Sequence, residues 1–160
     1  FLNHGGLANT LIGGWQMTAF YSAQSGLFFT PAFSGPDTSN TQAFGSTPDR
    51  IGDGNLPPDK RSIDRWFDAS AFAIPPNGRF GNSGRAILTG PGQQLLHFGL
   101  FKTFQPIERI SVRVQATFTN APNHTNFSNP NTNIAAPASV GTIRSAGAPR
   151  AGVVAAFLSF

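Results

Sequence analysis

The chain has 160 residues, no cysteine and a formal net charge of +4. The absence of cysteine excludes a disulfide scaffold, a zinc–thiolate site and a cysteine nucleophile. Charged residues make up only 11% of the chain, against roughly 25% in a typical soluble domain. Phe, Gly and Pro are abundant, with 16, 18 and 13 residues. This composition predicts β structure with long, turn-rich loops.

Two further classes are excluded by the distribution of residues. The longest uninterrupted apolar run, Val153–Leu158, has six residues, whereas a membrane-spanning helix needs about 18 or more. The basic residues are scattered rather than clustered on one face, so we expect no nucleic-acid partner. The chain begins at Phe1 without a signal-peptide pattern, which predicts a processed chain or a fragment.

Four segments alternate apolar and polar residues with the period of two that indicates β-strands. They span about 15–24, 95–104, 109–119 and 151–160. Their shared apolar faces, in chain order, comprise Trp15, Met17, Ala19 and Tyr21; then Leu96, Phe98, Leu100 and Phe104, interrupted by Lys102; then Ile110, Val112, Val114, Ala116 and Phe118; and last Val154, Ala156, Leu158 and Phe160. We therefore expect an all-β fold of antiparallel strands.

The connections between these segments are very unequal in length. Residues 105–108 predict a tight turn in which Pro106 fixes the backbone, so the second and third strands should pair as a hairpin. The other two connections have about 70 and about 30 residues. Loops of this length are unusual in a compact soluble domain, but outer-membrane barrels have short turns on one side and long loops on the other. With the C-terminus on the periplasmic side, both long connections fall outside the cell.

These features predict the last four or so strands of a large transmembrane β-barrel. Each segment of about ten residues has the length that a tilted strand needs to cross a bilayer. The alternative is a secreted or cell-surface β-sandwich with a structural or adhesive role, because a soluble antiparallel sheet with one solvated face alternates in the same way.

The long connection at 31–93 is expected to be mostly irregular, with at most a short helical turn near 62–72. Asp59, Ser62 or Asp64 is a candidate cap for that turn. Large aromatic residues are expected to anchor the loop against the sheet or the lumen wall: Trp66, Phe67 and Phe72.

No catalytic constellation is visible, so we expect no enzyme and no cofactor. Asp53 and Asn55 have the alternate spacing of calcium ligands, but the rest of 49–55 lacks it, which favours a solvated turn. His4, His97 and His124 are too far apart for a metal-ligand motif. Asparagine-rich residues 120–126 indicate turn chemistry.

The order of short motifs along the chain is more specific. The motifs are Gly13-Gly14-Trp15-Gln16, Gln24-Ser25-Gly26, Trp66-Phe67-Asp68, Gly81-Asn82-Ser83-Gly84-Arg85, Gly90-Pro91-Gly92, Phe101-Lys102-Thr103-Phe104, Asn123-His124, Asn126-Phe127 and Ser145-Ala146-Gly147. In this order they resemble the C-terminal end of TonB-dependent outer-membrane receptors, in particular the Oar-like subgroup with a carboxypeptidase-regulatory-like domain. The resemblance covers nearly the whole chain, so residues 1–160 are expected to form the C-terminal part of such a barrel. The apolar pattern that ends at Phe160 resembles an outer-membrane assembly signal: Val154, Ala156, Leu158 and Phe160.

The resemblance implies a plugged barrel of roughly 22 strands, with the plug and the remaining strands outside these residues. It implies localisation in the bacterial outer membrane, with lipid, the barrel assembly machinery and TonB as partners. Substrate would bind extracellular loops and pass through the lumen. The candidate contact residues are Arg50, Arg61, Arg65, Trp66 and Arg79 in the loop, and His97, Arg113 and Gln115 in the lumen. The isolated chain is expected to self-associate through open sheet edges.

Overall fold

A computed structural model describes residues 12–42, 46–107 and 109–160. The chain divides into two compact units. The first, here called the sheet unit, contains Phe1–Ala23, Gln94–Thr125 and Ala148–Phe160. The second, here called the loop unit, contains Gln24–Gln93 and Asn126–Gly147.

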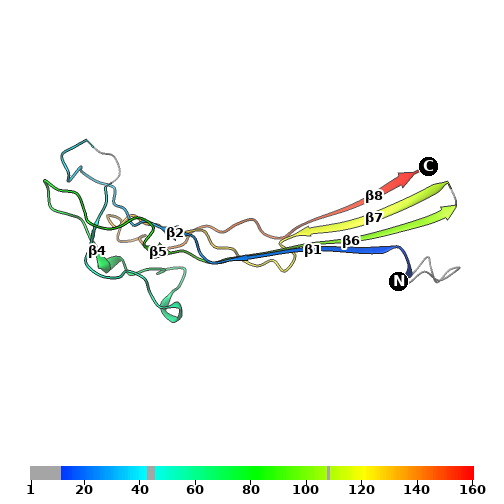
Figure 1. The fold of residues 1–160 in the computed structure, drawn as a ribbon, viewed down its shortest axis with the longest axis horizontal. Coiled ribbons are helices and arrows are strands. Elements are labelled where there is room, and N and C mark those ends of the chain that lie inside the picture. Colours follow the sequence, from blue (N-terminus) through cyan, green and yellow to red (C-terminus); the bar gives the residue numbers. More distant parts are fainter. Residues whose placement is uncertain (1–11, 43–45, 108) are drawn as a thin grey trace. The chain divides into compact units, whose positions relative to one another are not determined.

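Four long strands form one sheet in the order β1-β6-β7-β8 (Figure 1). They are β1 (Trp15–Gln24), β6 (Gln93–Ile107), β7 (Ile110–Thr119) and β8 (Ala151–Ser159). β7 is antiparallel to both β6 and β8. The backbone N–H of Thr103 in β6 donates to the carbonyl of Gly14, just before β1, at 2.9 Å. The four expected strands and the hairpin between the second and third are confirmed.

The turn between β6 and β7 is shorter than the sequence indicated. Gln105–Ile107 continue β6, and Ile107 lies opposite Ile110. The pairing slips between Phe104 and Ile107, where Pro106 has no N–H to give to the ladder. The expected turn over 105–108 is therefore wrong at its start. The irregular pairing accommodates Pro106, so the strand continues to Ile107 instead of ending at Phe104.

The pairing register sorts the side chains of the sheet onto two faces, because successive residues of a strand point to opposite sides. Phe98, Leu100, Lys102 and Phe104 of β6 lie opposite Phe118, Ala116, Val114 and Val112 of β7, which in turn lie opposite Gly152, Val154, Ala156 and Leu158 of β8. Trp15 of β1 joins this side, since Lys102 contacts its ring. We call it the apolar face. The opposite mixed face includes Phe20, His97, Phe101, Arg113, Gln115 and Phe157.

The described part of the sheet unit buries no hydrophobic core of its own. Val154 is 74% exposed and Met17 69% exposed, although both are on the apolar face. Among the described residues, every buried hydrophobic side chain belongs to the loop unit. The four strands do not close on themselves, so β1 and β8 are the two edges of the sheet.

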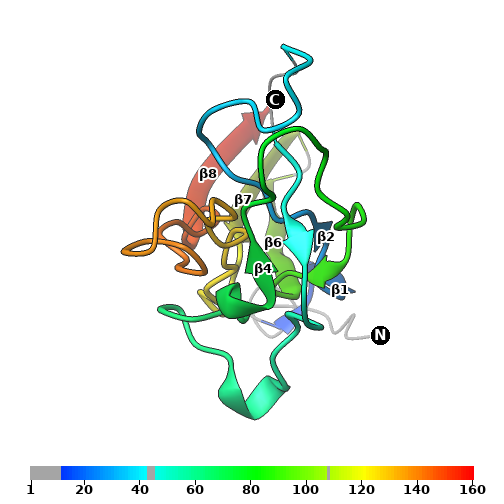
Figure 2. The ribbon, with the colours of Figure 1, turned by 90° about the vertical axis from the view of Figure 1, so that its left-hand side faces the viewer.

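The loop unit is irregular apart from very short elements (Figure 2). β2 (Phe28–Phe29) pairs with β5 (Leu88–Thr89), and β3 (Asp49–Arg50) pairs with β4 (Phe72–Ala73). Two single-turn 3-10 helices, η1 (Pro58–Lys60) and η2 (Ala69–Ala71), interrupt the loops. The mostly irregular loop and its short helical turn are confirmed.

The cap of that turn is different from the expected one. The Asp68 side chain accepts a hydrogen bond from the backbone N–H of Ser70 at the start of η2. The Ser62 hydroxyl accepts from the N–H of Arg65 at 3.1 Å, but in a turn that does not continue as a helix. η1 has no side-chain cap. Asp59, Ser62 and Asp64 are therefore not the caps of η2, because the helical turn begins later than the pattern suggested.

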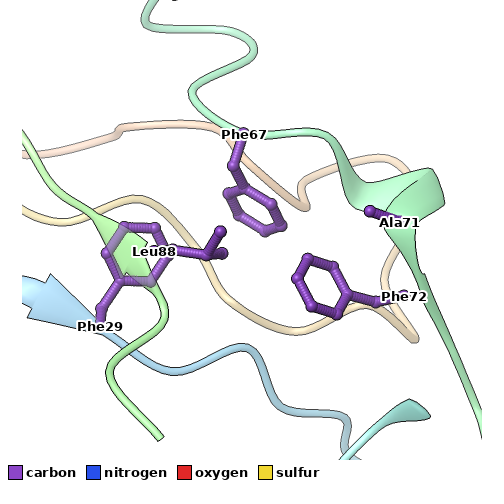
Figure 3. Close-up of a cluster of buried hydrophobic side chains, with 5 residues drawn as sticks. All are labelled: Phe29, Phe67, Ala71, Phe72 and Leu88. Atoms are coloured by element: carbon purple, nitrogen blue, oxygen red, sulfur yellow. The ribbon is translucent and has the colours of Figure 1, made fainter. Parts of the chain in front are cut away.

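A cluster of aromatic and aliphatic side chains holds the loop unit together: Phe29, Phe67, Ala71, Phe72 and Leu88 (Figure 3). The ring of Phe67 packs edge-on against Phe29 and Phe72, with centroid distances of 5.7 and 6.2 Å. Trp66, Ile134 and Val140 pack against the cluster. Trp66, Phe67 and Phe72 therefore anchor the loop as expected, but within the loop unit's own core, since two loops together supply enough apolar area to form one.

Backbone hydrogen bonds join the two loops of this unit. The N–H of Trp66 donates to the carbonyl of Gly141 at 2.9 Å, and the N–H of Ile143 donates to that of Ile63 at 2.7 Å. The N–H of Ile134 donates to the carbonyl of Ala32 at 2.9 Å. The connections β1–β6 and β7–β8 thus fold as one unit.

Asparagine side chains close the base of the second loop within the sheet unit. Asn120 is 2% exposed and has a positive φ of 49°. Its amide donates to the carbonyls of His124 and Ala148, and its oxygen accepts from the N–H of His124. Asn123 accepts from the N–H of Arg150 at 2.9 Å. The expected turn chemistry of this asparagine-rich segment is confirmed.

Candidate functional site

The candidate contact residues from the sequence do not form one constellation. Arg50, Arg61, Arg65, Trp66 and Arg79 belong to the loop unit, whereas His97, Arg113 and Gln115 belong to the sheet unit. Several of them have structural partners, which lowers their availability for a ligand.

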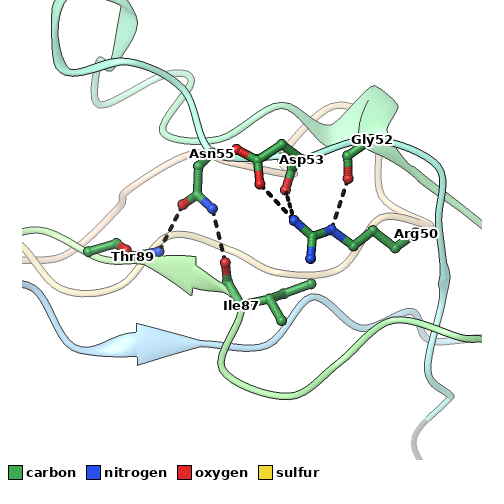
Figure 4. A network of polar contacts seen from close by, with 6 residues as sticks. All are labelled: Arg50, Gly52, Asp53, Asn55, Ile87 and Thr89. Carbon is green, nitrogen blue, oxygen red and sulfur yellow. Dashed lines mark hydrogen bonds and ion pairs between the residues drawn. The ribbon is translucent and has the colours of Figure 1, made fainter.

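Arg50 braces a turn (Figure 4). Its guanidinium donates to the carbonyls of Gly52 and Asp53 at 2.9 and 3.0 Å and pairs with the Asp53 carboxylate at 2.6 Å. Asn55 is turned toward β5: its amide donates to the Ile87 carbonyl and its oxygen accepts from the Thr89 N–H. Arg50 therefore neutralises the carboxylate that a calcium ion would need, and the segment 49–55 is a braced turn.

Trp66 and its two neighbouring arginines form a second structural group. The indole N–H of Trp66 donates to the Thr89 carbonyl at 2.8 Å. Arg61 lies 5.7 Å from the centre of the Trp66 ring and donates to the Leu56 carbonyl. Arg65 pairs with Asp68 at 3.0 Å, and its side chain is 63% exposed. Of the two arginines, Arg65 is the more exposed to solvent.

Arg79 forms a two-pronged pair with the carboxylate of Asp49. Asp49 also accepts from the N–H of Asn82, whose side-chain oxygen accepts from the N–H of Arg50. The hydrogen bonds from Arg79 hold the pKa of Asp49 below its ordinary value, and the same bonds raise the pKa of Arg79. Both groups are therefore charged at neutral pH, and their pairing holds the segment around Arg79 against β3.

A polar hollow of about 240 Å³ lies in the same unit. It is lined by Asp37, Thr38, Ser39, Ser46, Thr47, Phe80, Gly81 and Arg85. The Ser39 hydroxyl donates to Asp37 and lowers the pKa of that carboxyl, so it is ionised at neutral pH. The sequence analysis missed Asp37 and Arg85 as contact candidates. The hydroxyl-rich stretch after Asp37 was the available signal, but only the fold brings Arg85 to it.

The three sheet residues lie on the mixed face. His97 stacks on Phe20 with centroids 6.0 Å apart. The guanidinium of Arg113 lies 4.8 Å from the centre of the Phe101 ring. In the strand register, Gln115 of β7 lies opposite Phe101 of β6 and Ala155 of β8. This face combines polar groups with aromatic surfaces.

The residues of the expected assembly signal are exposed. Val154, Ala156 and Leu158 lie on the apolar face of β8. Phe160 follows the last strand residue and is 98% exposed. Among the described residues, no helix has the length and hydropathy to cross a membrane. In that same part of the chain no group of three acidic, His or Cys side chains is placed to hold a metal ion.

The strands are antiparallel and nine to fifteen residues long, and their apolar face is exposed in the part of the chain that the structure describes. A barrel in lipid requires strands of this kind. The chain belongs to the outer membrane beta barrel domain family, whose sequence model matches residues 1–152. No curated protein and no solved structure matches the chain significantly. Family membership places the protein in the bacterial outer membrane.

Proposed function

We propose that the chain is the C-terminal part of a TonB-dependent receptor of the Oar-like kind, spanning residues 1–160. It would bind a substrate at its extracellular loops and pass it through the barrel lumen, without catalysing a reaction. The barrel assembly machinery would recognise the strand that ends at Phe160, and TonB would energise the complete receptor.

The observation that carries this proposal is the arrangement of the two long connections. β1–β6 and β7–β8 are joined at one end of the strands, and the short turn between β6 and β7 is at the other. The long connections share a hydrophobic core and backbone hydrogen bonds. A packed unit of this kind can present side chains in fixed positions to a ligand, because few of its residues need to be ordered on binding.

Arg65, Arg85 and Arg113 are the strongest contact candidates. Arg65 is largely exposed, and Arg85 lines the polar hollow. Arg113 is exposed beside an aromatic ring on the mixed face, which is the lumen side if the apolar face contacts lipid. Arg50 and Arg79 are proposed to maintain the loop structure instead.

Uptake measurements test this proposal. Depletion of compounds from the medium would be compared in wild-type cells, cells that lack the protein and cells that lack TonB. We expect one compound or class to be retained in the medium by both mutants, and R85Q or R113Q to slow its uptake while K60Q does not. Depletion that requires the protein but not TonB would contradict the TonB-dependent mechanism.

The β-sandwich alternative makes a different prediction. A sandwich buries one face of each sheet against another sheet. The exposed apolar face of the four-stranded sheet argues against it. A complete protein that is soluble and shows no gel shift on heating would support the β-sandwich instead of the barrel.

A further inference from the structure

The apolar face of the sheet carries a single charged side chain among the described strand residues. Lys102 lies in a row with Val114 and Ala156, and the rows on either side contain only apolar residues: Leu100, Ala116 and Val154 on one side, and Phe104, Val112 and Leu158 on the other. A charge on a lipid-facing strand is unfavourable at the middle of the bilayer and is tolerated near its surfaces. The position of Lys102 therefore marks a depth in the membrane.

The side chain of Lys102 is directed toward one end of the sheet. Its ammonium lies 5.1 Å from the centre of the Trp15 ring and donates a hydrogen bond to the carbonyl of Gly13, which precedes β1. Gly13 and Trp15 are at the end of the sheet where β6 and β7 are joined by the short turn. Lysine at a membrane boundary extends in this way, with its alkyl chain on apolar surface and its ammonium toward water.

Trp15 adds the second feature of a membrane boundary. It is 54% exposed and lies on the apolar face. Aromatic side chains with a polar group are concentrated where hydrocarbon meets headgroups, and barrels have aromatic girdles at both boundaries. In outer-membrane barrels the short turns lie on the periplasmic side, so this end of the sheet faces the periplasmic leaflet.

We propose that Trp15 and Lys102 form a binding site for an anionic phospholipid headgroup of the periplasmic leaflet. The Lys102 ammonium pairs with a phosphate oxygen, since a compact, strongly charged ammonium binds phosphate as a point charge. Trp15 lies where the headgroup meets the acyl chains and orients the lysine by its ring face. The site rests on membership of the outer-membrane barrel family and does not depend on TonB-dependent transport.

Depth measurements on the complete barrel test the location. The chain itself contains no cysteine, so W15C and A19C variants, with any cysteine elsewhere in the barrel replaced, can each carry one nitroxide label. In phosphatidylcholine vesicles we expect the label at position 15 to lie near the headgroups and the label at position 19 to lie deeper. A label at position 15 that is as deep as that at position 19, or fully in water, would overturn the proposal.

Lipid selectivity tests the ligand. Spin-labelled phosphatidylglycerol and phosphatidylcholine would be compared for association with the barrel in phosphatidylcholine vesicles. We expect K102Q to lower the preference for phosphatidylglycerol at least twofold, K102R to retain it, and the loop-unit control K60Q to leave it unchanged. An unchanged preference in K102Q, with folding verified by the gel shift on heating, would refute the lipid site. If K102Q does not fold, the depth measurement, which keeps Lys102 in place, still decides the location. Failure of TonB-dependent uptake would affect neither result.

Discussion

Asp49 and Arg79 are joined by two parallel hydrogen bonds, with N–O distances of 2.9 and 2.5 Å, across 30 positions of the sequence. Asp49 is at the start of β3, and Arg79 lies in the loop that follows β4. A planar guanidinium matches a carboxylate in this geometry better than an ammonium does. Together with the hydrogen bonds that join Asn82 to Asp49 and Arg50, the pair therefore fixes the loop after β4 against β3.

The Asp49–Arg79 pair should make the loop unit sensitive to acid. The pKa of Asp49 is lowered in the folded protein, so its contribution to stability is present above the ordinary carboxyl pKa of 3.8 and is lost as the pH falls below it. We expect D49N to lower the stability of the loop unit at neutral pH and to flatten its pH dependence in acid. Hydrogen exchange of the loop amides between pH 7 and pH 3 measures both effects. If D49N has the same pH dependence in acid as the wild type, other carboxylates cause the loss of stability.

The aromatic core should determine the stability of the loop unit. Phe67 is 2% exposed and contacts two other rings, so F67A should cost about 3–5 kcal/mol. Phe80 is 63% exposed, so F80A serves as the control, with an effect within about 0.5 kcal/mol. Limited proteolysis of the loops in the folded barrel compares the two. Equal cleavage rates would mean that the cluster does not hold the loops together.

Neighbouring residues of β8 offer a direct test of the two faces. Val154 lies on the apolar face, opposite Ala116, whereas Val153 lies on the mixed face, opposite Thr117. If Val154 contacts lipid near the middle of the bilayer, V154K should cost about 2–4 kcal/mol, while V153K should cost much less. Denaturant titration of the barrel in vesicles gives both values. A larger cost for V153K would reverse the assignment of the faces.

The 160-residue chain by itself is expected to self-associate. β1 and β8 are open edges with unpaired backbone groups, and β8 carries no charged side chain that could block pairing. The exposed apolar face adds a patch larger than a soluble monomer usually tolerates. Sedimentation of the refolded chain without detergent should show assemblies. A monomer with a cooperative melt would instead require a soluble fold that buries this face.

The local alternation of apolar and polar residues was sufficient to predict the long strands but not the structure of the loop unit. In β7, Val112, Val114 and Ala116 alternate with Arg113 and Gln115, so a single segment defines both strand and face. β2 and β5 have two residues each, and Phe29 pairs with Leu88 far along the chain. A two-residue strand has no periodicity, and such distant pairing depends on the fold of everything between.

The same reasoning explains the mixed result for the candidate site. The size of Trp66 correctly indicated an anchor, because a large ring is rarely left in solvent. The sequence could not distinguish structural arginines from arginines available to a ligand. Arg50 braces a turn and Arg85 lines a hollow, but no local sequence pattern separates these two roles. Only the partners distinguish them.

The hydrogen bonds between the two loops also impose an order of events during biogenesis. The N–H of Ser34 is held by the side chain of Asn133, 99 positions later in the chain, and Ile134 and Val140 cover the core formed by residues of the first loop. The first loop therefore cannot complete its structure until residues 126–147 have been delivered to the same side of the membrane. Contacts so distant in sequence form slowly. The aromatic residues of the first loop remain uncovered during this interval, so the arrival of residues 126–147 is the step that ends their exposure to proteases and to other unfolded chains.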